Sequence, residues 1–281
     1  MKVLVTGADG QLGRDLIKHL IEQNIDYMAA GKNVFDIIDY NQVEEVAVKY
    51  QPNVIIHCAA YSKVDLAEEN PTTCMEVNVK GTENIAKICG KINAKMIFIS
   101  TDYVFSGDKD KPYEVDEFTK PLSVYGKSKL DAEKIVQRYL HKYFIVRISW
   151  LFGSRGNNFV RTIIKLAKEK SEINVVNDQI GSPTYTKDLS QFLVELARTN
   201  KYGIYHATNE GFCSWAEFAE TIIKFKKMTC KINGITSEEY MTRAVRPKNS
   251  RLSKASIEKN GFKRLPRWED ALNRYLNEIV E

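Results

Sequence analysis

The stretch VLVTGADGQLG, residues 3–13, decides the fold of this chain. A short apolar run leads into a turn with three glycines, and Leu12, Leu16 and Leu20 then recur at helical spacing. A strand, a glycine turn and a helix in this order bring backbone amides and the positive end of the helix dipole to a pyrophosphate. We therefore expect a dinucleotide to bind at this turn. The residues expected to contact it are Gly7, Gly10, Gln11, Leu12 and Gly13.

The segments that follow alternate apolar runs with stretches of helical periodicity. Near-continuous apolar runs are typical of strands whose two faces are both covered by helices. Their alternation with helices indicates an α/β fold, a Rossmann-type doubly wound parallel sheet. The predicted strands after the first are residues 26–30, 54–57, 96–100, 144–148 and a run near 204, and the predicted later helices are residues 43–50, 82–91, 123–141, 159–170 and 187–199.

The pattern changes after Trp150, where glycine and asparagine cluster in residues 153–158. We predict that residues 1–150 form a dinucleotide-binding domain, to which the chain returns at about residues 183–208. The remaining segments, residues 151–182 and 209–281, are predicted to form mainly a smaller, interleaved α/β lobe that binds substrate.

The amino-acid composition restricts the kinds of ligand and the compartment that we expect for this protein. The 281 residues are 43% hydrophobic and 27% charged, and the net charge of +5 suits an anionic small molecule but is too weak to predict nucleic-acid binding. Five cysteines, an odd number without a CxxC pair, indicate reduced thiols. No apolar stretch has the length of a membrane span or a signal peptide, so we expect a cytoplasmic protein without membrane contact.

The end of the second predicted strand bears on the choice of cofactor. NAD sites usually carry a carboxylate there for the ribose hydroxyls, whereas this strand ends in Gly31-Lys32. Lys32 therefore favours a 2′-phosphate and hence NADPH, with NADH still possible, although Lys32 would also fit an exposed loop. Asp36 and Ile37 lie beside the adenine or, alternatively, form a helix cap.

Tyr125 and Lys129 are four residues apart in a predicted helix, so both side chains project from one face. An ammonium beside a phenol favours the phenolate and should lower the phenol pKa toward neutral pH. Such a phenol can protonate a newly formed alkoxide. Thr101 follows the strand at 96–100, at the edge of the sheet where ligands bind, and can orient the substrate oxygen.

With the glycine turn and the YxxxK pair in this order, the chain resembles the extended short-chain dehydrogenases/reductases. Within that superfamily it resembles the dTDP-4-dehydrorhamnose reductase family along nearly its whole length. The stretches that carry the resemblance are residues 3–13, 57–65, 100–105, 125–129, 147–150, 178–184 and 246–252.

The resemblance implies a reaction and a set of site residues. Hydride from NADPH or NADH would reduce the C4 keto group of dTDP-4-dehydro-β-L-rhamnose to dTDP-β-L-rhamnose, for polysaccharide biosynthesis. Thr101, Tyr125 and Lys129 would be catalytic, with Tyr125 as proton donor and both Tyr125 and Lys129 also at the cofactor. Further implied cofactor contacts are Asp36, Ile37, Ala59, Ala60, Tyr61 and Ser62, and implied substrate contacts are Val64, Thr101, Asp102, Tyr103, Trp150, Gln179 and Arg246.

One departure concerns metal. Some members of the family dimerise around magnesium held by glutamates, but here the first-helix position is Asp15 and a lysine, Lys187, follows Pro183 closely. A lysine beside such a site is unfavourable for a cation. We therefore expect no magnesium and no other metal site, and a monomer or weak homodimer.

Two alternatives share these motifs. A nucleotide-sugar epimerase or dehydratase has the same glycine turn and YxxxK pair, but a dehydratase needs an acidic pair after the threonine, and here Asp102 is followed by Tyr103. The other alternative is a non-catalytic regulatory subunit, resembling that of methionine adenosyltransferase, which would bind cofactor without turnover.

Overall fold

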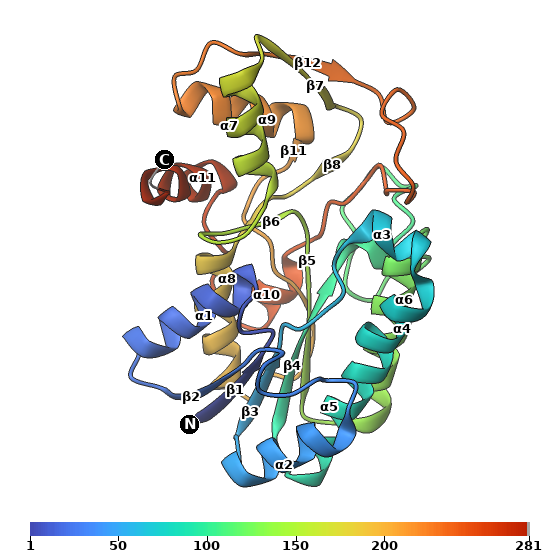
Figure 1. Cartoon of the computed structure of the whole chain (residues 1–281), viewed down its shortest axis with the longest axis vertical. Coiled ribbons are helices and arrows are strands. Elements are labelled where there is room, and N and C mark those ends of the chain that lie inside the picture. The colour runs from blue at the N-terminus through green and yellow to red at the C-terminus, as the bar shows by residue number, and fades with distance from the viewer. Residues whose placement is uncertain (280–281) are drawn as a thin grey trace.

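A six-stranded parallel sheet forms the centre of the computed structural model, which describes residues 1–279 (Figure 1). Every neighbouring pair of strands in this sheet is parallel. The predicted doubly wound α/β fold is thus confirmed. In order across the sheet the strands are β2 (Asp26–Ala30), β1 (Lys2–Thr6), β3 (Val54–His57), β4 (Lys95–Thr101), β5 (Tyr143–Ile148) and β10 (Gly203–His206).

Helices cover both faces of the sheet because successive strand residues point to opposite sides. Val3 and Val5 enter one apolar core, and Leu4 between them enters the other. The first core is closed by α1 (Gln11–Glu22) and α8 (Thr186–Ala197), and the second by α2 (Tyr40–Tyr50), α5 (Gly81–Lys91) and α6 (Val124–Tyr139).

The strand order creates the crevice for a ligand. From β1 the chain crosses to β2 on one side of the sheet and then returns to β3 on the other side. At such a switch point the connections leave the carboxyl ends of adjacent strands in opposite directions, and ligands bind in the gap. Here the gap lies between the turn after Thr6 and the segment after His57.

A third apolar core lies outside the sheet. It joins aromatic residues of three helices to several short strands, and it occupies the upper half of the molecule in Figure 1. Its elements are β6 (Leu151–Phe152), α7 (Phe159–Glu169), β7 (Glu172–Val176), β9 (Thr184–Tyr185), β11 (Cys213–Ser214), α9 (Trp215–Phe225), β12 (Lys231–Ile235) and α11 (Trp268–Glu278). Two further elements are β8 (Ile180–Gly181), which pairs with β11, and α10 (Ala255–Lys259), whose Ile257 packs into the core of the sheet instead.

An N-terminal capping hydrogen bond determines where the predicted catalytic helix begins. Ser123 accepts a hydrogen bond from the backbone N–H of Gly126, 3.1 Å away, and so starts α6 with Tyr125 in its first turn. A Cβ on Gly126 would collide with the carbonyl oxygen of Tyr103. Glycine therefore lets α6 pack directly on the short helix η2 (Asp102–Val104) that follows Thr101.

An interrupted helix runs beside this region. It begins with α3 (Val64–Glu69) and α4 (Pro71–Met75), passes through the π-helical turn η1 (Glu76–Lys80) and continues as α5. Such π turns are frequent at functional sites. Within residues 1–279, no helix has the length and apolar character needed to cross a membrane.

Candidate active site

The glycine turn after β1 has the shape that a pyrophosphate requires. Gly7 has a φ of +65°, and a Cβ there would stand 2.6 Å from the backbone nitrogen of Ala59. Gly10 caps α1 without any side-chain acceptor, so the first amides of the helix are not capped by a side chain. Backbone amides at a helix N-terminus attract anions, and the turn therefore fits a dinucleotide.

A cleft of about 760 Å³ begins at this turn and extends to the start of α6. It brings together most of the residues expected from the sequence. Those that line it are Gly7, Gly10, Gln11, Leu12, Gly13, Lys32, Asp36, Ile37, Ala59, Ala60, Ser62, Val64, Thr101, Asp102, Tyr103, Tyr125, Lys129 and Trp150.

Three expected residues do not line the cleft. The Tyr61 hydroxyl points away and donates to a backbone carbonyl of α3, 3.4 Å away. Gln179 donates to Ser237 over 3.0 Å. The guanidinium of Arg246 pairs with Asp65, with 2.6 Å between Nη2 and Oδ2.

The far end of the cleft, beyond the glycine turn, holds the residues expected at the adenosine. Lys32 is exposed there, directly after the end of β2. Asp36 caps a turn by accepting from the N–H of Ile38 at 3.1 Å, and still lines the cleft. Sequence reasoning missed Asp9, whose carboxylate reaches Gly31 from the glycine turn and brings an acidic group to the end of β2.

Tyr125 lies edge-on to Tyr103, with 5.6 Å between ring centroids and 77° between ring planes. Burial raises the pKa of its phenol, the negative charge of Asp102 raises it further, and a hydrogen bond with Thr101 opposes the shift. The pKa of Tyr125 is thus raised, and not lowered as expected from the lysine four residues on, with burial as the main cause. The phenol is consequently held in its protonated form, as a proton donor requires.

Lys129 is 3% exposed and lies one helical turn after Tyr125. Its Nζ is 4.0 Å from the centroid of the Phe98 ring. Burial lowers the pKa of this ammonium to about 7, against the attraction of Glu133, which raises it. The lysine therefore stands close to the point of losing its charge at neutral pH.

Asp102 lines the cleft and is itself buried. Its Oδ1 accepts from the Thr101 hydroxyl at 3.0 Å, while Oδ2 is buried and has no hydrogen-bond partner in residues 1–279. Burial raises the pKa of this carboxyl to about 6, and hydrogen bonds from Ser250 and Thr101 oppose that shift. An unpartnered buried carboxylate oxygen beside a cleft is suited to a ligand hydroxyl.

Asn78, in the π-helical turn, was not anticipated from the sequence. Its amide accepts from the N–H of Tyr61 at 2.8 Å and donates to the Tyr61 carbonyl at 3.1 Å. The same amide nitrogen donates to Ser128 at 2.9 Å, and Ser128 donates to the carbonyl of Tyr125 at 2.7 Å. Asn78 thus fixes the Ala60–Ser62 wall of the cleft relative to α6.

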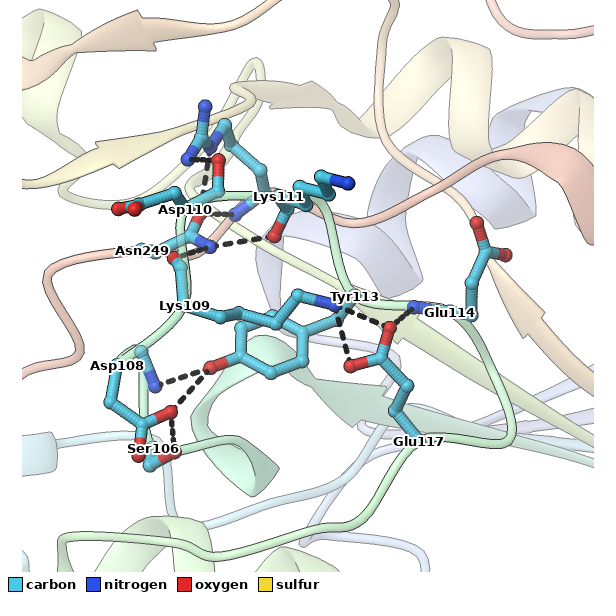
Figure 2. Close-up of polar contacts among 11 residues, drawn as sticks. Ser106, Asp108, Lys109, Asp110, Lys111, Tyr113, Glu114, Glu117 and Asn249 are labelled. Carbon is cyan, nitrogen blue, oxygen red and sulfur yellow. Dashed lines mark hydrogen bonds and ion pairs between the residues drawn. The ribbon is translucent and has the colours of Figure 1, made fainter.

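The connection between η2 and α6 is held by the C-terminal segment. Figure 2 shows Asn249, whose side-chain amide donates to the carbonyls of Lys109 and Lys111 at 2.6 and 2.9 Å. Lys109 in turn pairs with Glu117 at 2.5 Å. Because this loop joins Thr101 to α6, its anchoring limits how far the two can separate.

Trp150 lies where the chain passes from the sheet to the third core, the one outside the sheet. Its φ of +49° lies in the left-handed region, which costs free energy for a bulky residue. Its ring stacks on Trp215, 3.7 Å away and 14° from parallel, and a Cβ on Gly181 would collide with it. Trp215 was another residue that the sequence did not single out.

No group of three or more histidine, cysteine, aspartate or glutamate side chains within residues 1–279 could hold a metal ion. Asp15 instead accepts hydrogen bonds from Ser154 and from Thr186, the first residue of α8. Lys187 pairs with Glu278 at 2.6 Å. The carboxylates of Asp15 and Glu278 are therefore already bound by donor groups of the protein itself.

Known proteins resemble this chain over its whole length. The family model described as RmlD substrate binding domain matches residues 1–281. The spore coat polysaccharide biosynthesis protein SpsK of Bacillus subtilis is 41% identical over 278 residues, which cover 99% of this chain and 97% of that protein. The dTDP-4-dehydrorhamnose reductase of Aggregatibacter actinomycetemcomitans is 39% identical over 284 residues, covering 96% of this chain and 97% of that protein.

A solved structure is also similar throughout. The crystal structure of dTDP-4-dehydrorhamnose reductase from Bacillus anthracis in complex with NADP superposes with a TM-score of 0.97, at 43% identity and with 99% of each chain covered. The resemblance carried by the motifs is confirmed. The chain belongs to the dTDP-4-dehydrorhamnose reductase family.

Proposed function

We propose that this chain reduces the C4 keto group of dTDP-4-dehydro-β-L-rhamnose to dTDP-β-L-rhamnose with NADPH, NADH being a possible second cofactor. The observation that carries the proposal is that Thr101, Tyr125 and Lys129 line the same cleft as the glycine turn. The names of the relatives at 39% identity and the NADP in the Bacillus anthracis structure support it.

The glycine turn and α1 would hold the pyrophosphate through backbone amides, and Lys32 would meet the 2′-phosphate. Ala59, Ala60 and Ser62 would form the wall against the nicotinamide. When bound, the reduced nicotinamide supplies a hydride to the carbonyl carbon of the sugar.

Tyr125 would donate its phenolic proton to the sugar oxygen as the C–O double bond is reduced, leaving a phenolate. Thr101 would orient that oxygen, and the free Oδ2 of Asp102 would accept a sugar hydroxyl. Lys129 would stabilise the phenolate until a proton returns from solvent. The raised pKa of Tyr125 keeps the proton in place before reaction, so turnover is expected to use the phenol and not a pre-formed phenolate.

We further propose that residues 1–150, with the return at about 183–208, bind the cofactor. Residues 151–182 and 209–281 would mainly bind the sugar-nucleotide substrate. Trp150 would contact the sugar, and Gln179 and Arg246 the diphosphate. Arg246 would have to share its present partner Asp65 with the ligand. Five unpaired cysteines suit a reducing cytoplasm, and we expect a monomer or weak homodimer.

The test is an assay of NADPH absorbance with purified protein and the dTDP-4-keto sugar made in place by the preceding epimerase. Loss of absorbance that depends on the sugar, with dTDP-rhamnose as product, is expected. Binding of NADPH without oxidation would favour the regulatory-subunit alternative. Conversion of the sugar by this chain when the preceding epimerase is left out, without net cofactor consumption, would favour an epimerase or dehydratase.

A further inference from the structure

We propose that Glu133 is a positioning residue that keeps Lys129 charged, and that Ser100 and Arg147 hold its carboxylate in place for this task. The inference rests on the proposed function, because it concerns the lysine that serves Tyr125. It adds to the catalytic set a residue that acts through Lys129, one helical turn further along α6.

Spacing on α6 brings the three side chains into line. Tyr125, Lys129 and Glu133 are each four residues apart in one continuous helix, so they project from the same face. Glu133 is 2% exposed, and Lys129 is 3% exposed. A carboxylate so deeply buried is expensive unless it is paired and hydrogen-bonded, so its position needs an explanation.

Both carboxylate oxygens of Glu133 accept hydrogen bonds from buried side chains. Oε1 accepts from the Ser100 hydroxyl at 2.5 Å and from Arg147 Nε at 2.9 Å, and Oε2 accepts from Arg147 Nη2 at 2.8 Å. Ser100 immediately precedes Thr101 on β4. The hydrogen bond from Ser100 therefore ties the helix of Tyr125 to β4, the strand of Thr101, and the bidentate pair with Arg147 ties the same helix to β5.

The positive charge of Arg147 does not remove the effect of the Glu133 carboxylate on Lys129. Nη1 of Arg147 donates to the carbonyl of Val115 at 3.0 Å and lies 3.4 Å from Nε2 of His206. Arg147 belongs to β5, whereas Glu133 shares α6 with Lys129 at a distance of one helical turn. Glu133 raises the pKa of Lys129, whereas Arg147 is not among the groups that shift it.

The other surroundings of Lys129 cannot take over this role. The Phe98 ring lies under its ammonium, and His57 on β3 is neutral, because burial lowers its pKa to about 3. Cys58 and Cys74 face the lysine as thiols, since burial raises the pKa of both. Among the described residues that shift the pKa of Lys129, Glu133 is the only carboxylate.

The consequence is a shift in pH dependence. An opposite charge nearby typically raises the pKa of an ammonium by about one unit or more. Glu133→Gln should therefore lower the pKa of Lys129 by about one unit, and the reductase should lose activity at a correspondingly lower pH on the alkaline side. The value of kcat should fall more than KM rises, because Glu133 does not line the cleft.

Two readouts test this. The first is the pH profile of kcat and kcat/KM for NADPH-dependent reduction. The second is the 13Cε chemical shift of Lys129 against pH in 13C-lysine-labelled protein, with the signal assigned by its loss in Lys129→Arg. The second readout needs no turnover, so it stands even if the sugar substrate has been misassigned.

Three further variants distinguish an electrostatic role of Glu133 from a purely structural one. Glu133→Asp keeps a carboxylate and should restore most of the pKa. Glu133→Gln/Arg147→Met removes both buried charges, so the melting temperature should recover relative to Glu133→Gln while the pKa of Lys129 stays low. Asp131→Asn removes a carboxylate of α6 that pairs at the surface with Lys127, and it should leave the pKa of Lys129 unchanged.

The proposal is overturned if the Lys129 titration in Glu133→Gln coincides with that of the wild type. It is also overturned if the double variant recovers both melting temperature and pH profile, because the pair would then serve the fold alone. If the wild type titrates as expected but reduces no sugar, only the proposed function fails.

Discussion

Replacing Tyr125 with phenylalanine removes one oxygen atom and leaves the ring that packs edge-on against Tyr103. The N-cap of α6 is made by Ser123, which the change does not touch. The hydrogen bond with Thr101 is lost, which costs about 1 kcal/mol of stability. The variant should therefore fold and bind cofactor, with its dissociation constant for NADPH within about threefold of the wild type.

The loss in catalysis should be far larger. General acid catalysis contributes about 100- to 10,000-fold to a rate, equivalent to about 3–5 kcal/mol of transition-state stabilisation. Water in the cleft can replace part of the proton donation, so we expect a fall of about 1,000-fold in kcat with little change in KM.

The measurement combines NADPH oxidation under saturating sugar with cofactor titration by fluorescence and a thermal melt of both proteins. Activity within about fivefold of the wild type, with unchanged NADPH binding, would refute the assignment of Tyr125 as the proton donor. A variant that melts much earlier than the wild type would show that the hydroxyl serves the fold.

Three further predictions address the cofactor turn, the adenosine end and the buried carboxylate. Lys32→Ala should weaken NADPH by about 1 kcal/mol or more and leave NADH nearly unchanged, since only NADPH carries the 2′-phosphate; equal losses for both cofactors in titration calorimetry would contradict the role of Lys32. Gly13→Ala should abolish tight cofactor binding and destabilise the fold by about 1–3 kcal/mol, because its Cβ would collide with the carbonyl oxygen of Gly7. Its matched control is Gly90→Ala on α5, whose Cβ would meet nothing closer than 3.8 Å and should stabilise the protein by about 0.5–1 kcal/mol; urea unfolding that ranks the two variants alike would be inconsistent with the turn geometry. Asp102→Asn should make the protein more stable at pH 8 while lowering activity. Burial raises the pKa of this carboxyl to about 6, so the native protein favours the protonated form and loses stability as the pH rises from about 4 through 6. The gain should reach about 3 kcal/mol at pH 8 and about half of that at pH 5, and a gain independent of pH in unfolding curves would count against it.

The four inner strands of the sheet were predictable because they are buried on both faces. The run Val54–His57 was predicted with the bounds that the structure has, and the helix predicted from Val43 begins three residues earlier, at Tyr40, because Asp39 caps it. The segment from α3 to η1 was not predicted. Its residues 64–80 lack an apolar period, and their helical form depends on packing against α6.

The candidate site likewise has a part that the sequence predicts and a part that it does not. The glycine turn and the Tyr125–Lys129 pair are local patterns, and a periodicity argument finds them. Asn78, Glu133 and Trp215 act through partners that are distant along the chain. Asp9 lies inside the predicted glycine turn, but its proximity to Gly31 depends on the pairing of β1 with β2. Tertiary contacts decide such roles, and so they emerged only once the elements were placed in space.

The most direct test of the account is a crystal structure of the chain with NADP and a dTDP-sugar bound. We predict that the nicotinamide ring lies against the Ala60–Ser62 wall, with its C4 atom about 3–3.5 Å from C4 of the sugar. The Tyr125 hydroxyl should then lie within hydrogen-bonding distance of the sugar oxygen at that carbon. A dinucleotide bound elsewhere, or a Tyr125 hydroxyl directed away from the nicotinamide, would contradict the account.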